Sequence, residues 1–163
     1  MDPMRSLRAS LGGGFALTVI LLTGCGGPIY QEGKSPASAI TPRSSWQASG
    51  DMRGAQAVLD GDIGTAAVSA APDGGGSITI DLGKPCVFNM AVIEHGTNEW
   101  AFARRVALLT SLDGISFTQR YSALGTRRVT ILCPAAPILA RYVRLQAVVA
   151  GDRPWLVAEV YLQ

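Results

Sequence analysis

The sequence is poor in charge and in side chains that mark catalysis. Only 16% of its 163 residues are charged, and 14 basic against 12 acidic residues leave a formal net charge of +2. That balance excludes a nucleic-acid-binding surface built on excess positive charge. Histidine occurs once, at His95, and no Gly-x-Ser-x-Gly motif or Cys-x-x-Cys pair is present. Nothing therefore marks a nucleophile, and we predict that the protein is not an enzyme.

Long hydrophobic runs are also lacking, except near the N-terminus. Residues 11–22 are uncharged and mostly apolar, but this run is too short to cross a bilayer core about 30 Å thick. Arg5 and Arg8 precede it, so we interpret residues 1–24 as a signal peptide. The sequence Leu22-Thr23-Gly24-Cys25 resembles a bacterial lipobox, which implies that Cys25 is acylated and anchors an exported protein in a membrane. By analogy with enteric bacteria, Gly26 favours the outer membrane, with the domain on its periplasmic or surface face.

The segment after the predicted anchor is polar. Residues 25–45 contain three prolines and no apolar periodicity, which is typical of a flexible tether. The alternative is an N-terminal strand packed on the domain. We expect the folded domain to span residues 46–163.

Hydrophobic residues recur with a period of two in this domain, which indicates β-strands. Residues 78–82 alternate clearly, and Gly83-Lys84-Pro85 is expected to end that strand. Residues 87–93 form a nearly continuous apolar run, typical of a strand covered on both faces. Asp113-Gly114 lies between two alternating segments and predicts a hairpin. We predict an all-β fold of seven or eight strands in a two-sheet β-sandwich or jelly roll.

The order of these segments resembles the discoidin family, also called coagulation factor 5/8 type C domains and, in bacteria, family 32 carbohydrate-binding modules. The matching segments are residues 46–49, 57–65, 77–85, 111–117, 140–145 and 157–161. One departure is Ala67, because the family usually has Trp two residues after the position of Thr65. The resemblance implies a galactose-binding-like sandwich with a non-catalytic binding role.

The resemblance also implies a structural calcium ion. The matching residues are Asp60, Asp62, Thr65 and Glu159. Carboxylate, hydroxyl and carbonyl oxygens are the hard ligands that Ca²⁺ takes. The alternative is a plain Asp-Gly turn, with Glu159 facing solvent or an arginine.

Two loops are candidates for ligand binding, because sugar recognition needs planar polar groups and an aromatic face. The candidate ligand-binding residues are His95, Asn98, Glu99, Trp100, Arg153 and Trp155. The alternatives are a structural histidine and tryptophans that only cover the end of the sandwich. We predict a lipid-anchored module that binds an envelope or extracellular glycan. The alternative function is a structural lipoprotein that docks onto protein partners in an envelope-spanning assembly.

Two cysteines remain after Cys25. Cys86 and Cys133 each adjoin a proline at a strand end, and exported chains sit in an oxidising compartment. We predict a disulfide between them, the alternative being two buried free thiols. The basic pairs Arg104-Arg105 and Arg127-Arg128 are interpreted as solvated charges at strand edges.

Overall fold

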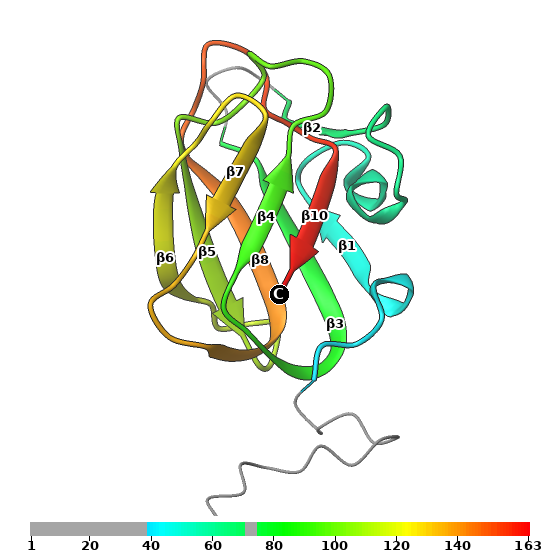
Figure 1. Cartoon of the computed structure of the whole chain (residues 1–163), viewed down its shortest axis with the longest axis vertical. Coiled ribbons are helices and arrows are strands. Elements are labelled where there is room, and N and C mark those ends of the chain that lie inside the picture. Colours follow the sequence, from blue (N-terminus) through cyan, green and yellow to red (C-terminus); the bar gives the residue numbers. More distant parts are fainter. Residues whose placement is uncertain (1–38, 71–74) are drawn as a thin grey trace, which may run out of the picture. The chain divides into compact units, whose positions relative to one another are not determined.

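Two antiparallel sheets face each other in the computed structural model, which describes residues 39–70 and 75–163 (Figure 1). The five-stranded sheet has the order β1 (Gln47–Gly50), β3 (Ser77–Phe88), β8 (Ile138–Val149), β5 (Arg105–Ser111), β6 (Thr118–Leu124). The three-stranded sheet has the order β10 (Glu159–Leu162), β4 (Ala91–Glu94), β7 (Val129–Leu132). A short pair, β2 (Ala67–Val68) and β9 (Leu156–Val157), and two 3₁₀ turns, η1 (Arg43–Ser45) and η2 (Ala55–Leu59), complete the described part. The predicted all-β sandwich is confirmed.

The core lies between the two sheets and follows the period-two pattern. Ile78, Ile80 and Leu82 of β3 are fully buried, and Ile93 and Val160 bury their side chains from the other sheet. Burying one such side chain stabilises a fold by about 1.5–3 kcal/mol. This layer of branched aliphatic residues holds the strand ends, and hence the loops, in place.

The path of the chain through residues 83–93 differs from the prediction. Gly83-Lys84-Pro85 does not end the strand, because β3 continues to Phe88 with a register shift between Asp81 and Cys86. Gly83 has φ +80° and donates its N–H to Asp81 Oδ1 at 2.8 Å, so the three residues form a bulge. The predicted strand over residues 87–93 is wrong, since the chain turns at Asn89 and Met90 before β4 begins.

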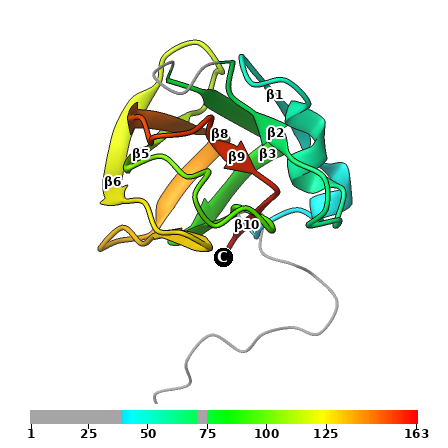
Figure 2. The same ribbon diagram turned by 90° about the horizontal axis from the view of Figure 1, so that it is seen from above.

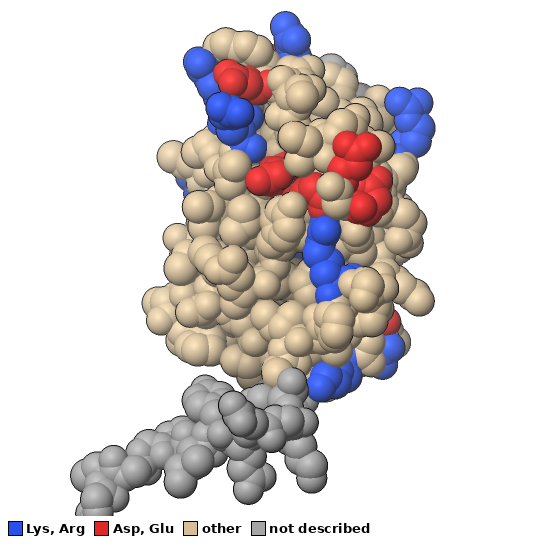
Figure 3. Space-filling model, turned by 45° about the vertical axis from the view of Figure 1, so that its right-hand side comes forward, with Lys and Arg blue, Asp and Glu red and all other residues tan. Residues whose placement is uncertain are grey.

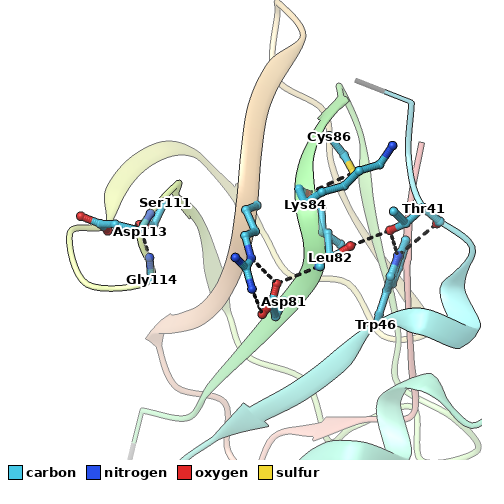
Figure 4. Close-up of polar contacts among 11 residues, drawn as sticks. Thr41, Trp46, Asp81, Leu82, Lys84, Cys86, Ser111, Asp113 and Gly114 are labelled. Carbon is cyan, nitrogen blue, oxygen red and sulfur yellow. Dashed lines mark hydrogen bonds and ion pairs between the residues drawn. The ribbon is translucent and has the colours of Figure 1, made fainter. Parts of the chain in front are cut away.

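The domain begins earlier than predicted. Thr41 Oγ1 donates to Leu82 O at 2.7 Å, and Trp46 Nε1 donates to Thr41 Oγ1 at 2.9 Å (Figure 4). Trp46 is buried in the core, and Ile40 packs against it. Residues 40–45 therefore belong to the sandwich and not to the tether, because their polar groups are bonded to it. The predicted signal peptide and Cys25 lie outside the described residues. Within residues 39–70 and 75–163, no helix is long and apolar enough to span a bilayer.

The predicted disulfide is not formed in the structure, where both cysteines are free. Cys86 lies in β3, fully buried, and its thiol contacts Lys84 O at 3.4 Å (Figure 4). Cys133 is exposed and follows β7 of the opposite sheet. Cys86 is buried in the core and Cys133 is exposed to solvent, so the two thiols lie in different environments although each adjoins a proline in the sequence.

Candidate functional site

Three loops meet at one end of the sandwich, and we call this end the rim (Figures 1 and 2). It comprises residues 95–104, 125–128 and 150–155, which follow β4, β6 and β8. Backbone hydrogen bonds join the loops: His95 N donates to Arg128 O at 3.0 Å and Gly125 N to Arg104 O at 3.0 Å. Such bonds fix the loops on the sheet ends, so the rim is a preformed surface.

Trp100 is the main exposed aromatic residue of the rim. It is 49% exposed and follows a turn in which Asn98 Oδ1 accepts a hydrogen bond from Trp100 N at 3.3 Å. The guanidinium carbon of Arg127 lies 3.8 Å from the centre of the indole ring, a cation–π contact. The arginine holds the ring in position and leaves half of the residue's surface accessible.

Further charged groups lie on the three rim loops. Arg128 Nε lies 3.8 Å from Glu99 Oε1, and Arg104 pairs with Asp152 on the third loop. These partners are largely exposed, so each pair contributes little stability and its groups stay available to a ligand. Beside them is a pocket of about 130 Å³. Its lining residues are Ile63, Glu94, Gly96, Arg128 and Val129.

Arg127 and Arg128 were missed as site residues by the sequence interpretation. The pair was treated as solvated edge charge, whereas both guanidinium groups contact the 95–104 loop. The sequence shows only that the pair directly precedes a strand. The sheet order, in which this strand neighbours β4, is what places the turn beside the 95–104 loop.

Of the predicted ligand-binding residues, the structure brings Asn98, Glu99 and Trp100 together on one loop. Arg153 is exposed on the neighbouring loop. His95 is 1% exposed, with Nδ1 2.8 Å from Leu156 O and Nε2 2.9 Å from Thr130 Oγ1. Burial lowers the pKa of His95 below its usual range. It is a structural, neutral histidine, and its prediction as a ligand contact is wrong.

Trp155 is a second correction. Its side chain is 2% exposed and belongs to the hydrophobic core, so it offers no face to a ligand. The backbone explains the burial: Trp155 N donates to Ser69 Oγ at 2.8 Å and Ser69 N to Trp155 O at 3.0 Å. These bonds extend the β2–β9 pair and turn the indole inward.

A larger concavity lies away from the rim, on the outer face of the five-stranded sheet. This sheet groove has a volume of about 430 Å³ and is lined mainly by β1, β3 and β8. Arg144 stacks on Phe117 at 3.8 Å and donates Nε to Thr79 Oγ1 at 2.9 Å. Arg141 forms two 2.9 Å hydrogen bonds with Asp81, and these bonds lower the pKa of that carboxyl group. The polar side chains on this face of the sheet are thus largely bonded to one another.

The loop predicted to hold calcium is closed by its own hydrogen bonds. Asp60 accepts from Asp62 N at 2.8 Å and from the Thr65 hydroxyl at 2.7 Å, and Asp62 Oδ1 accepts from Gly64 N at 2.8 Å. The Thr65 hydroxyl is the main cause of the lowered pKa of Asp60. The carboxylate oxygens that would bind a calcium ion therefore accept hydrogen bonds from N–H and O–H groups of the same loop.

The remaining predicted ligand, Glu159, is fully buried. Its Oε1 accepts a hydrogen bond from Gly61 N at 2.6 Å, and its other oxygen is paired with the guanidinium of Arg43. In the described ranges, no three His, Cys, Asp or Glu side chains are grouped so that they could hold a metal ion. The donor set as arranged does not fit a bound Ca²⁺.

Comparisons with known proteins agree on the fold. CpGH89CBM32-5 from Clostridium perfringens, solved with GalNAc-β-1,3-galactose, superposes with a TM-score of 0.68 at 19% identity, covering 77% of this chain and 99% of the relative. The family 32 module of C. perfringens NanJ, solved with galactose, gives 0.65 at 20% identity, with 77% and 97% covered. Chitosan-binding module 1 from a Paenibacillus sp. IK-5 chitosanase/glucanase gives 0.61 at 21%, with 77% and 96% covered.

At these identities the structural similarity shows the fold alone. A sequence comparison with curated proteins gives no significant match. The model of the F5/8 type C domain, however, matches residues 36–160, which is most of the chain and agrees with a domain that begins before Trp46. The chain therefore belongs to the F5/8 type C domain family.

Proposed function

We propose that this protein is a non-catalytic glycan-binding module that recognises its sugar at the rim. The observation that carries the proposal is the half-exposed indole of Trp100, flanked by the side chains of Arg127, Arg128 and Glu99. An aromatic face packs against the C–H side of a sugar ring, and guanidinium and carboxylate groups pair with its hydroxyls. Relatives solved with galactose and with GalNAc-β-1,3-galactose support this ligand class.

The proposed site is an exposed ring on a loop, and the one pocket beside it is small. This pocket of about 130 Å³, which Arg128 lines and Trp100 does not, is smaller than the roughly 300–1,000 Å³ of ordinary ligand pockets. A shallow site buries few ligand atoms, so we expect weak binding to one site and stronger attachment to a polymer that presents many copies.

A non-catalytic role fits the side chains around the rim. His95, the single histidine of the chain, uses both ring nitrogens in structural hydrogen bonds and is buried. It is therefore not accessible as a general base.

We further propose that acylated Cys25 holds the module at the outer membrane. The support is the sequence pattern of residues 5–25 alone. Wild-type protein is expected in the membrane fraction of the producing bacterium and Cys25→Ser protein in the soluble fraction. Equal distribution of the two proteins would contradict the anchor and would leave the glycan proposal intact.

The decisive experiment is a glycan array probed with the purified full chain, followed by titration of the best ligand. Trp100→Ala is expected to weaken binding at least about tenfold, since stacking and orientation are both lost. Tyr121→Ala is the matched control, because Tyr121 is an exposed aromatic residue of β6 outside the rim loops. Its affinity is expected to equal that of the wild type.

Two results would overturn the rim assignment. Loss of binding in Gln47→Ala with wild-type affinity in Trp100→Ala would move the ligand to the sheet groove, which Gln47 lines. No binding to any glycan by folded protein would contradict the function and favour docking onto envelope proteins. Crosslinking in the native envelope would then identify the partner.

A further inference from the structure

Glu159 is a buried carboxylate whose position needs an explanation. Side chains alternate along β10, so Val160 and Leu162 enter the core while Glu159 and Tyr161 lie on the outer side of the strand. The loop after η2 covers Glu159, through the hydrogen bond from Gly61 N, and leaves it 0% exposed. A buried carboxylate is costly unless a cation compensates it.

The compensating cation is the guanidinium of Arg43. It is ion-paired with Glu159, and its Nη2 donates to Val58 O at 2.8 Å. Its Nε donates to Val160 O at 3.1 Å, and its guanidinium carbon lies 4.7 Å from the centre of the Tyr161 ring. One planar group thus joins η1, the end of η2 and the last strand. Figure 3 shows acidic atoms gathered on one face of the sandwich, with basic atoms reaching up to them.

The contacts of Arg43 match those expected of a structural calcium ion. A cation in this loop would neutralise Glu159, collect backbone carbonyl oxygens and tie the loop to the closing strand. Arg43 does each of these through its contacts with Glu159, Val58 O and Val160 O. Its charge also adds to the lowering of the Asp60 pKa, after the larger effects of the Thr65 hydroxyl and the Asp62 backbone.

We propose that Arg43 is the built-in cation of the 60–65 loop, and that it excludes calcium from this position. A guanidinium carries five N–H donors in a fixed plane and stays protonated at every physiological pH. The loop is then held at any calcium concentration. The 60–65 loop borders the rim through Ile63, which lines the pocket there. Neither Arg43 nor Glu159 is among the residues proposed to contact the sugar, and the test of the proposal measures melting and calcium binding without a glycan.

The test measures calcium dependence of stability in the purified full chain. Wild-type protein is expected to melt at the same temperature in excess Ca²⁺ and in EDTA, and to give no heat of calcium binding in a titration. Arg43→Met keeps a long apolar stem against Tyr161 and removes the donors. In EDTA its melting temperature is expected to fall by about 10 °C, as for a broken buried ion pair.

Calcium should restore part of that loss in Arg43→Met, because Glu159 and Val58 O become available to it. Arg53→Met is the matched control, since Arg53 is exposed and its removal should leave melting and calcium response unchanged. Calcium binding by the wild type would overturn the proposal, and this measurement needs no variant. A calcium-independent loss in Arg43→Met would also overturn it, because the loop would then be no cation site.

Discussion

At the scale of single residues, His95 gives the molecule a defined pH response. The Leu156 carbonyl accepts a hydrogen bond from Nδ1–H, so Nε2 is left to accept one from the Thr130 hydroxyl. Both partners are uncharged, so neither compensates the charge of a protonated ring. Burial lowers the pKa of His95, so the unfolded chain takes up a proton at a higher pH than the folded one.

The stabilising effect of neutral His95 is therefore present above the unfolded pKa of about 6.5 and is lost as the pH falls below it. We expect the unfolding free energy to drop by up to about 1.4 kcal/mol per pH unit between about pH 6 and pH 5. His95→Gln should flatten this part of the curve, measured by urea unfolding at fixed pH steps. The lowered carboxyl pKa values of Asp60 and Asp81 act only below about pH 4. A wild-type curve already flat from pH 7 to 5 would refute the assignment.

The two cysteines of the domain differ in accessibility, and this difference can be measured. Cys133 is exposed and Cys86 is fully buried. We expect a thiol reagent to modify Cys133 quickly in native protein and Cys86 only after unfolding in denaturant. The whole set is measured in a Cys25→Ser background, in which protein that also carries Cys133→Ser should not react in the native state. Failure of either thiol to react in denaturant without a reductant would show that the disulfide forms after all.

At the scale of elements, the sequence predicted those features whose cause is local. The hairpin between β5 and β6 is confirmed, because Gly114 adopts φ +76° and Asp113 accepts hydrogen bonds from Ile115 N and Ser116 N at 2.9 Å. The hydrogen bond from the Ser111 hydroxyl, followed by these two backbone bonds, lowers the pKa of Asp113 to about 2. Residues next to each other in sequence supply every contact involved.

The bulge in β3 was missed for the opposite reason. Pro85 lacks an N–H and normally interrupts a strand, but here it falls within the register shift between Asp81 and Cys86, where no ladder bond is lost. Similarly, the inward path of Trp155 depends on Ser69, 86 residues away in sequence. Local patterns identify a loop rich in aromatic and polar residues, but only long-range pairing decides which of its side chains are buried.

Glycine substitutions test the hairpin directly. An alanine Cβ at position 114 would lie 3.1 Å from Tyr142 Cζ and would also be strained at φ +76°. Gly61 has a similar φ of +85°, with nothing within 4 Å of such a Cβ, and serves as the control. We expect Gly61→Ala to cost about 1 kcal/mol from backbone strain and Gly114→Ala about 1–2 kcal/mol more, in chemical unfolding. Equal costs would show that the β5–β6 hairpin does not pack on Tyr142.

At the scale of the whole molecule, chain entry and the rim lie at opposite ends of the sandwich. Ala91, Leu132 and Leu162 mark one end of the three-stranded sheet, and Ile40 lines a pocket with Leu162. Glu94 and Val129 mark the other end, from which the rim loops leave. Residue 39 is 14 residues after Cys25, a span of at most about 50 Å. The proposed anchor at Cys25 would attach the domain through its entry end, which would then lie on average nearer the bilayer than the rim.

The opposite positions of the entry end and the rim predict which of two labels lies nearer the bilayer. A fluorophore on Cys133, which follows β7 at the entry end, should be quenched by doxyl lipids more strongly than one at the rim. The rim label is placed with Thr97→Cys in a Cys133→Ser background, because Thr97 is exposed on the 95–104 loop. Both labels are measured on acylated protein in vesicles, and the Cys133 label on Cys25→Ser protein gives the baseline without an anchor. Stronger quenching at position 97 would mean that the rim faces the lipid, and the bound glycan would then have to be sought at the membrane surface itself.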